Sequence, residues 1–183
     1  RRVLFRSQAL TYTRTLVAQL SPPLLKEFGL PMALKWLAEQ MIQRDLKVSL
    51  ELGTEHLALP EDQAMLLFQS VRELLMNIVK HASAKQARIT VREEEGWLHI
   101  TVADQGRGFS PPDSIPATGS TGIPGFGLFS IRERMLALGG RFELRSQPGQ
   151  GTEATLTAPL APGKARAKQP AGVDGTVPSA VPI

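Results

Sequence analysis

The chain has 183 residues and no cysteine, so it is long enough for one well-packed domain with a short appendage and holds no disulfide or zinc–thiolate site. It contains no run of about 18 apolar residues that could cross a membrane. The net charge of +4 arises at the ends of the chain, because residues 1–20 carry +4 and residues 161–183 carry +2. The middle is therefore slightly acidic. This argues against nucleic-acid binding, which requires a basic face.

The first segment, residues 1–20, predicts a helix, because Leu10 and Val17 recur at helical spacing. Pro22 and Pro23 then interrupt it, since proline cannot continue a helical ladder. A second helix is expected from Gly29 onward, with one buried stripe. That stripe consists of Leu30, Leu34, Leu37 and Met41, and Trp36 is expected to pack beside it.

The next elements are a strand and a long helix. Apolar residues alternate over Lys47–Leu52, which predicts a strand with one buried face. Pro60, followed by two acids, favours the start of a helix, because proline and acids suit a first helical turn. The buried stripe of this helix is formed by Leu67, Val71, Leu74 and Ile78.

Beside that stripe, Glu73, Asn77 and Lys80 are expected to stand together on one helix face. A carboxylate can polarise an acceptor group, an amide oxygen suits Mg²⁺, and an ammonium can reach a phosphate. Many solvated helix faces carry the same residue types, so this face gains meaning only from the motifs that follow it.

A hairpin is predicted from residues 88–93 and 97–103, joined by the turn at 94–96. Its second strand runs straight into Asp104, followed by Gly106 and Gly108. A carboxylate at this place could accept a hydrogen bond from an exocyclic amine, and the glycines let a flat base lie against the backbone. A plain turn after a strand is the alternative.

Residues 110–124 are rich in Pro, Gly and Ser and poor in bulky apolar residues, so we expect a mobile loop. Gly125 and Gly127 lead from this loop into a helix, whose free N-terminal N–H groups can bind an anion. Gly139 and Gly140 end that helix. Its apolar positions are Leu128, Ile131, Met135 and Leu138.

Two more strands are predicted at residues 141–145 and 153–158, paired around Pro148 and Gly149, with Thr152 at the glycine turn. From residue 161 to 183 the chain is rich in Pro, Ala and Gly and has no apolar periodicity. We expect this tail to be disordered.

Four motifs follow one another along the chain. They are RELLMNIVKHA at residues 72–82, DQGRGF at 104–109, GFGL at 125–128 and GQGT at 149–152. In this order they resemble the N box and the glycine boxes of the ATP-binding domain of sensor histidine kinases, in the superfamily that includes gyrase, heat-shock chaperones and mismatch-repair ATPases. The resemblance covers roughly residues 20–160, and it looks closest to the nitrate-sensor-like class.

The resemblance implies an α+β fold of the Bergerat type, which is a two-layer α/β sandwich with a mixed, mainly antiparallel sheet. It implies the end of a dimerisation and phosphotransfer helical hairpin at residues 1–22, an ATP-binding catalytic domain at 23–160 and the tail at 161–183. An ordinary terminal helix stays open for the first of these. The loop at 110–124 looks like the lid over the ATP phosphates.

Carried over position by position, the resemblance assigns the base end of the site to two residues. Asp104 looks like the adenine-specifying carboxylate, and Thr152 looks like a water-assisted contact near the same base. The base pocket and the lid would be shaped by Gly106, Gly108, Phe109, Gly125, Gly127 and Leu128.

The phosphate end is assigned in the same way. Asn77 looks like the Mg²⁺ ligand, Glu73 like the residue that polarises the attacking group, and Lys80 and His81 like contacts to phosphate or ribose. Glu73 and Lys80 are thus the expected catalytic residues. Many relatives have a second asparagine just before the metal ligand, where this chain has Met76.

The reaction implied is transfer of the γ-phosphoryl of ATP to a histidine, and then to an aspartate of a response regulator with a helix-turn-helix output domain. None of the three histidines, His56, His81 and His99, is expected on an exposed acceptor helix. The chain also begins at Arg1 rather than at a methionine. We therefore expect the acceptor in another part of a longer protein. We expect that protein to be a homodimer and this stretch to be cytoplasmic, with a membrane anchor elsewhere left open.

Two alternatives stay open. A degenerate ATP domain would hold nucleotide without chemistry, or only dimerise and dock a partner, but Glu73, Asn77 and Asp104 are all present. A serine-directed kinase of the anti-sigma type shares the fold. The predicted helix before Pro22 argues against it, because that type needs no dimerisation hairpin.

Overall fold

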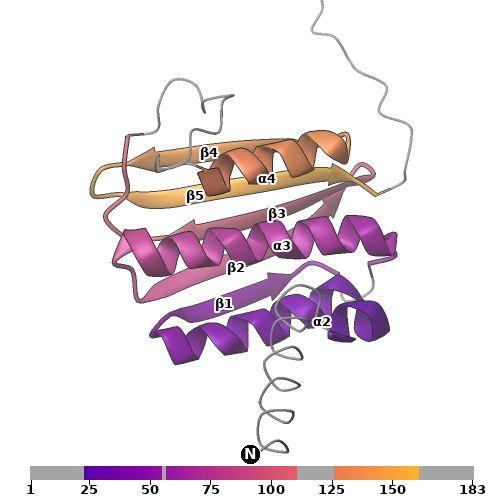
Figure 1. Ribbon diagram of the computed structural model, residues 1–183, viewed down its shortest axis with the longest axis horizontal. Coiled ribbons are helices and arrows are strands. Elements are labelled where there is room, and N and C mark those ends of the chain that lie inside the picture. Colours follow the sequence, from indigo (N-terminus) through magenta and orange to yellow (C-terminus); the bar gives the residue numbers. More distant parts are fainter. Residues whose placement is uncertain (1–22, 55–56, 111–125, 161–183) are drawn as a thin grey trace, which may run out of the picture.

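The computed structural model describes residues 23–54, 57–110 and 126–160. Within them, a five-stranded sheet forms one layer and helices form the other (Figure 1). Several predicted features lie outside the described residues: the helix at 1–20, all of the lid at 110–124 except Ser110, Gly125, the tail at 161–183 and His56. The expectations for those parts therefore stay predictions.

The sheet has the strand order β1-β2-β3-β5-β4. β1 (Lys47–Leu52) runs parallel to β2 (Gln86–Glu94), and a crossover through a helix joins the two. The remaining pairs are antiparallel and involve β3 (Trp97–Asp104), β4 (Arg141–Gln147) and β5 (Gly151–Pro159). The predicted mixed, mainly antiparallel sheet is confirmed.

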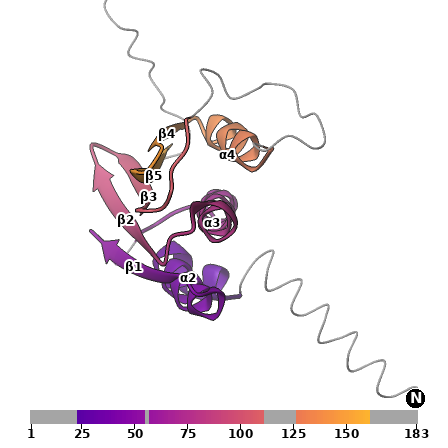
Figure 2. The same ribbon diagram turned by 90° about the vertical axis from the view of Figure 1, so that its left-hand side faces the viewer.

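Three helices cover one face of this sheet, as the end-on view shows (Figure 2). They are α2 (Pro23–Met41), α3 (Glu61–Asn77) and α4 (Phe126–Ala137). α2 packs on β1, α4 packs on β4, and α3 contacts both other helices. The opposite face, hereafter the open face, carries no helix in the described part of the chain.

The core lies between the two layers. All four residues of the predicted α3 stripe are buried, as are the stripe residues of α2. On the sheet, alternate residues of β2 and β3 are buried as their apolar alternation predicts, with Ile89, Val91, Leu98 and Ile100 fully covered. Trp36 packs against this core, as expected.

Two helix details add to the sequence prediction. α2 contains two helical segments that meet at a kink, because Gly29 is non-helical, with φ +73° and ψ −177°. The second segment follows Gly29, as predicted, and the first, from Pro23, was not predicted. The helix after Pro60 stops being α-helical at Asn77 and continues as a π-helical turn over Ile78–Ala82. Such turns are rare and often occur at functional sites.

Among the described helices, none is both long enough and apolar enough to span a bilayer.

Candidate functional site

The helix-covered face of the sheet ends in a row of polar side chains. Asp104 of β3 lies opposite Thr152 of β5, and Thr152 lies opposite Ser146 of β4. The preceding row on this face is apolar and consists of Val102, Ala154 and Leu144. The covered face therefore changes from core to polar surface within one row, and we call Asp104, Thr152 and Ser146 the polar row.

Asp104 is the buried acid of this row, with 8% of its surface exposed. Its Oδ1 accepts a hydrogen bond from the Gly106 amide at 2.7 Å. Burial raises the pKa of the Asp104 carboxyl above its ordinary value, and the Gly106 amide opposes that rise. The carboxylate has a second oxygen, Oδ2, with which it can accept from a ligand.

The loop after β3 is braced by its backbone. The Arg107 amide donates to the carbonyl of Ala82 at 2.8 Å, and the Arg107 carbonyl accepts from the Gly149 amide at 2.6 Å. One residue thus joins the π-helical end of α3 to the turn between β4 and β5. The two predicted glycine motifs at residues 104–109 and 149–152 lie side by side for this reason.

The glycines of this loop are required by close approach. A Cβ on Gly106 would lie 2.7 Å from the Cβ of Ala82 and 2.8 Å from Oδ1 of Asp104. Gly108 has φ +57°, and a Cβ there would lie against the carbonyl oxygens of Gln147 and Gly151. Both positions therefore exclude larger residues, because the loop packs closely against Ala82 and the β4–β5 hairpin; their role in shaping a base pocket stays a prediction.

Ser146 joins the loop to the strand hairpin. The Phe109 amide donates to Ser146 Oγ at 3.0 Å, and Ser146 Oγ donates to the carbonyl of Gly151 at 2.9 Å. Its third contact, at 3.0 Å, is with the hydroxyl of Thr152. The Phe109 side chain itself is exposed.

Two helices meet beside this region. A Cβ on Gly127, in the first turn of α4, would lie 2.5 Å from Oε1 of Glu73 on α3. Because Gly127 has no side chain, the Glu73 carboxylate can occupy the space next to it. Leu128, the next residue, packs against the core.

The remaining predicted residues occupy the end of the same helix. Asn77 is partly exposed and lies one turn beyond Glu73, so both present oxygen atoms on neighbouring positions. Lys80 and His81 are exposed and lie in the π-helical turn. A π-helical turn holds more residues than an α-helical turn, so the side chains of Lys80 and His81 point in other directions than α-helical spacing predicts. That spacing was the basis for grouping Lys80 with Glu73 and Asn77.

The structure thus brings the predicted residues together in two groups. Hydrogen bonds and strand pairing unite the base-end set, which consists of Asp104, Gly106, Gly108, Phe109 and Thr152. A second set is joined through the end of α3 and the start of α4, and consists of Glu73, Asn77, Lys80, His81, Gly127 and Leu128.

Sequence reasoning missed Ser146. The predicted strand ended at residue 145, whereas β4 continues to Gln147. The available signal was its alternation: Phe142 and Leu144 point to the covered face, so the next residue on that face is Ser146, a polar side chain at a core-facing position. A polar residue that breaks an apolar alternation at a strand end is therefore a candidate site residue, as Asp104 is.

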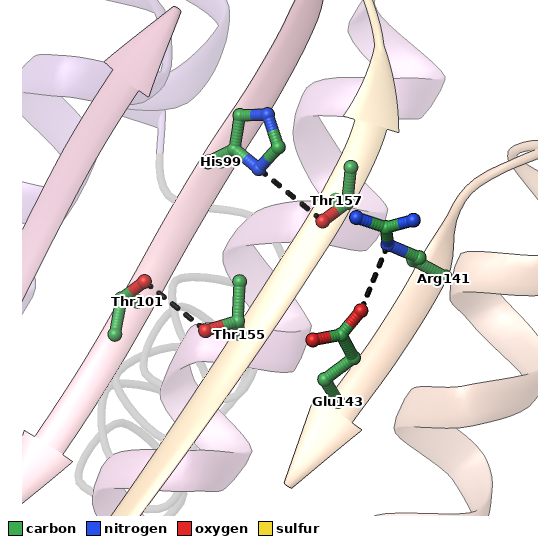
Figure 3. A network of polar contacts seen from close by, with 6 residues as sticks. All are labelled: His99, Thr101, Arg141, Glu143, Thr155 and Thr157. Carbon is green, nitrogen blue, oxygen red and sulfur yellow. Dashed lines mark hydrogen bonds and ion pairs between the residues drawn. The ribbon is translucent and has the colours of Figure 1, made fainter.

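A different polar network lies on the open face (Figure 3). There the hydroxyls of Thr101 and Thr155 are 3.2 Å apart, and His99 Nδ1 lies 3.4 Å from the hydroxyl of Thr157. A shallow hollow on this face is lined by Thr90, Arg92, His99, Thr101 and Glu153. None of the predicted site residues belongs to it.

No group of three His, Asp or Glu side chains that could hold a metal occurs in the described ranges. A cation near α3 would therefore need most of its ligands from elsewhere. Asn77 offers one amide oxygen, which suits a hard ion that keeps water and ligand oxygens in its shell.

Comparison with known families gives a match, over residues 62–162, to the family described as histidine kinase-, DNA gyrase B-, and HSP90-like ATPase. Among curated proteins, the sensor histidine kinase ComP of Bacillus subtilis is 29% identical over 84% of this chain and 20% of its own length. The signal transduction histidine-protein kinase/phosphatase UhpB of Salmonella typhimurium is 32% identical over 78% of this chain and 27% of its own. The chain spans a fifth to two fifths of the length of such relatives.

Solved structures give the same picture of the fold. The blue-light activated histidine kinase of Erythrobacter litoralis superposes with a TM-score of 0.61 at 23% identity, over 84% of this chain and 50% of that one. Full-length ShkA, solved in complex with AMPPNP, superposes with a TM-score of 0.59 at 25% identity, over 74% of this chain and 31% of that one.

Proposed function

Since the chain belongs to the family of histidine kinase-, DNA gyrase B- and HSP90-like ATPases, we propose that it is the ATP-binding catalytic part of a sensor histidine kinase. In this proposal it transfers the γ-phosphoryl of ATP to a histidine supplied by another segment, for relay to an aspartate of a response regulator. The names of its relatives, which are sensor and signal-transduction histidine kinases, support the reaction and the partner. The nitrate-sensor-like class, a regulator with a helix-turn-helix output domain and a homodimeric full protein are part of the proposal.

The observation that carries the proposal is the polar row beside the braced glycine loop. Asp104 is a buried acid at a strand end whose apolar neighbours stop one row earlier. Beside it, Gly106 and Gly108 let the loop backbone pack closely against Ala82, Asp104 and the β4–β5 hairpin. A buried carboxylate next to bare backbone suits a flat heterocycle with an exocyclic amine, such as adenine, whose 6-amino group stands where guanine has an oxo group.

The phosphate end is proposed at the meeting of α3 and α4. The N-terminus of α4 begins within the glycine motif, where free N–H groups favour anions. Lys80 supplies a mobile positive charge, and His81 a further contact. Glu73, held beside Gly127, would orient the incoming imidazole and accept its proton.

Mg²⁺ is proposed as the metal, with Asn77 as its protein ligand and phosphate oxygens and water completing the shell. When bound, the ion would neutralise charge on the phosphates. The full-length neighbour solved with AMPPNP supports an ATP-like ligand for this chain. Since phosphoryl transfer depends mainly on positioning and charge neutralisation, one metal ligand, one cation and backbone donors are sufficient chemistry.

The test is a phosphoryl-transfer assay with the 183-residue chain. It is incubated with γ-labelled Mg-ATP alone, and also with a longer sensor-kinase chain whose own site is disabled by the Asn77→Ala change. We expect label on the longer chain only, because His81 lies in the proposed nucleotide site and His99 lies on the open face. The matched control is the 183-residue chain carrying Asn77→Ala, which should transfer nothing.

Each other outcome identifies an alternative. Acid-labile phosphate on the 183-residue chain alone would reject an acceptor elsewhere. Nucleotide binding without transfer to any histidine would favour the degenerate binding module. Stable phosphate on a serine of a partner would favour the anti-sigma type.

A further inference from the structure

Ser146 makes three hydrogen-bond contacts with a single hydroxyl. Its Oγ lies 3.0 Å from the Phe109 amide, 2.9 Å from the Gly151 carbonyl and 3.0 Å from the Thr152 hydroxyl. These partners belong to the loop after β3 and to the first two residues of β5. The serine therefore lies at the point where both glycine motifs meet.

The backbone partners fix the direction of the third contact. An amide N–H can only donate and a carbonyl can only accept, so Ser146 accepts from Phe109 and donates its one proton to Gly151. The Thr152 hydroxyl must then donate to Ser146. Its proton is used in that bond, and it can offer a ligand only lone pairs.

This assignment changes the chemistry of the polar row. Asp104 lies directly opposite Thr152 in the β3–β5 pairing, and its carboxylate is also an acceptor. The Gly106 amide, a neighbouring backbone donor, is already bonded to Oδ1 of Asp104. The row therefore presents acceptors to a ligand that contacts it directly, and offers no hydroxyl proton.

Given the proposed function, on which this step rests, we propose that Ser146 is a positioning residue that orients the Thr152 hydroxyl as an acceptor and so favours a 6-amino purine over a 6-oxo purine. An amino group has protons to give to the row, whereas an oxo group meets only lone pairs. Ser146 also holds the Phe109 amide, so the loop that carries Gly106 and Gly108 keeps its place against the row.

The open face supplies a matched control. Thr101 and Thr155 lie on β3 and β5 and approach each other at 3.2 Å, but either hydroxyl can be the donor. Removing the Thr155 hydroxyl therefore deletes a cross-strand pair on the same strands without touching the polar row.

The experiment measures the affinity of the 183-residue chain for Mg-ATP and for Mg-ITP, whose base carries an oxo group in place of the amine. The variants are Ser146→Ala, Ser146→Thr, Thr152→Val, the double variant Ser146→Ala/Thr152→Val, and Thr155→Val. We expect the preference for ATP over ITP to fall about 2- to 10-fold in Ser146→Ala, the range for one hydrogen bond. In the preference for ATP over ITP, the double variant should match Thr152→Val, because Ser146 sets that preference through the threonine hydroxyl. Ser146→Thr should keep the preference, and Thr155→Val should leave it unchanged.

A second readout needs no ligand. Exchange of the Phe109 amide proton should accelerate in Ser146→Ala and be restored in Ser146→Thr, with no change in Thr155→Val, whereas a general loss of packing would accelerate many amides together.

The outcomes separate the two proposals. A wild-type chain that prefers ATP, together with a folded Ser146→Ala variant that keeps the full preference, would overturn the role of Ser146 and leave the proposed function standing. A wild-type chain that binds neither nucleotide would overturn the proposed function and the base preference together.

Discussion

The two faces of the sheet each join a pair of hydroxyl side chains across strands, and the pairs differ in what surrounds them. On the covered face, Ser146 and Thr152 approach at 3.0 Å next to an amide and a carbonyl that fix who donates. On the open face, Thr101 and Thr155 approach at 3.2 Å and can exchange roles. The Phe109 amide and the Gly151 carbonyl, which belong to the glycine turns, therefore determine which hydroxyl of the covered pair donates the hydrogen bond.

The same strands also differ along their length. In the interior of the covered face, the facing residues of β3 and β5 are apolar and buried, such as Ile100 with Leu156. At the end of these strands, the same alternation brings Asp104 opposite Thr152. One strand pairing thus builds both the core and the candidate site, so mutations at the strand end should separate stability from binding.

The largest effect is expected from Gly108→Ala. The residue would adopt φ +57° and its Cβ would meet the carbonyl oxygens of Gln147 and Gly151. Gly96→Ala is the matched control, because Gly96 has φ +80° and nothing within 4 Å of the added atom. We expect Gly108→Ala to lower the free energy of unfolding by about 3 kcal/mol and Gly96→Ala by about 1 kcal/mol. Equal losses in urea unfolding would show that backbone strain alone matters and that the loop is not packed against the hairpin.

Asp104→Asn should separate the two properties of the strand end. The amide can still accept from Gly106 but offers a donor where the carboxylate offered an acceptor, so affinity for ATP should fall about tenfold or more. Glu153→Gln, an exposed acid on the open face one residue from Thr152, is the control and should bind normally. Equal calorimetric affinities for wild type and Asp104→Asn would reject Asp104 as the base contact.

The same variant carries a pH prediction. Burial raises the pKa of Asp104 in the folded state above 3.8, so the folded state binds this proton more tightly than the unfolded state does. Wild-type stability should therefore fall, relative to Asp104→Asn, as pH rises from the ordinary pKa through the raised one, and stay lower above it. Urea unfolding of both chains across this window measures the difference. A difference that moves in the opposite direction would mean that the Gly106 hydrogen bond outweighs burial.

The smallest effect is expected on the open face. Arg141 and Glu143 form an ion pair at 3.0 Å with both side chains largely exposed (Figure 3). A double-mutant cycle with Arg141→Met and Glu143→Gln should give a coupling of about 0.5 kcal/mol or less, and ATP affinity should not change. A coupling above about 1 kcal/mol would indicate that this face is more ordered and less solvated than an ordinary surface.

Much of this could be predicted from the sequence where the signal is local. The apolar stripe of α3 and the alternation of β3 predicted which faces are buried, and the acid and glycines at residues 104–108 indicated the candidate site. The role of Ser146 could not be predicted, because it depends on the pairing of Ser146 with Thr152 and on a loop from another hairpin. The contact between Glu73 and Gly127 depends likewise on how α3 packs on α4.

Helix details were hidden for a different reason. The kink at Gly29 separates two helical segments of α2, and only the second was predicted, because its apolar stripe begins at Leu30. The π-helical turn after Asn77 keeps Ile78 and Ala82 buried. Because these residues are four apart, an α-helical period fits them equally well, and the sequence pattern does not distinguish the two helix types.

The most direct test of the account is to titrate ADP and Mg²⁺ into the ¹⁵N-labelled 183-residue chain and follow the backbone amide shifts. The account predicts that the largest changes occur at the strand end and the helix start, at Asp104, Gly106, Gly127 and Thr152. His99 and Thr155, on the same strands but on the open face, should not change. Shifts centred on His99 and Thr155, or none at all at saturating nucleotide, would contradict the claim that the polar row is the nucleotide site.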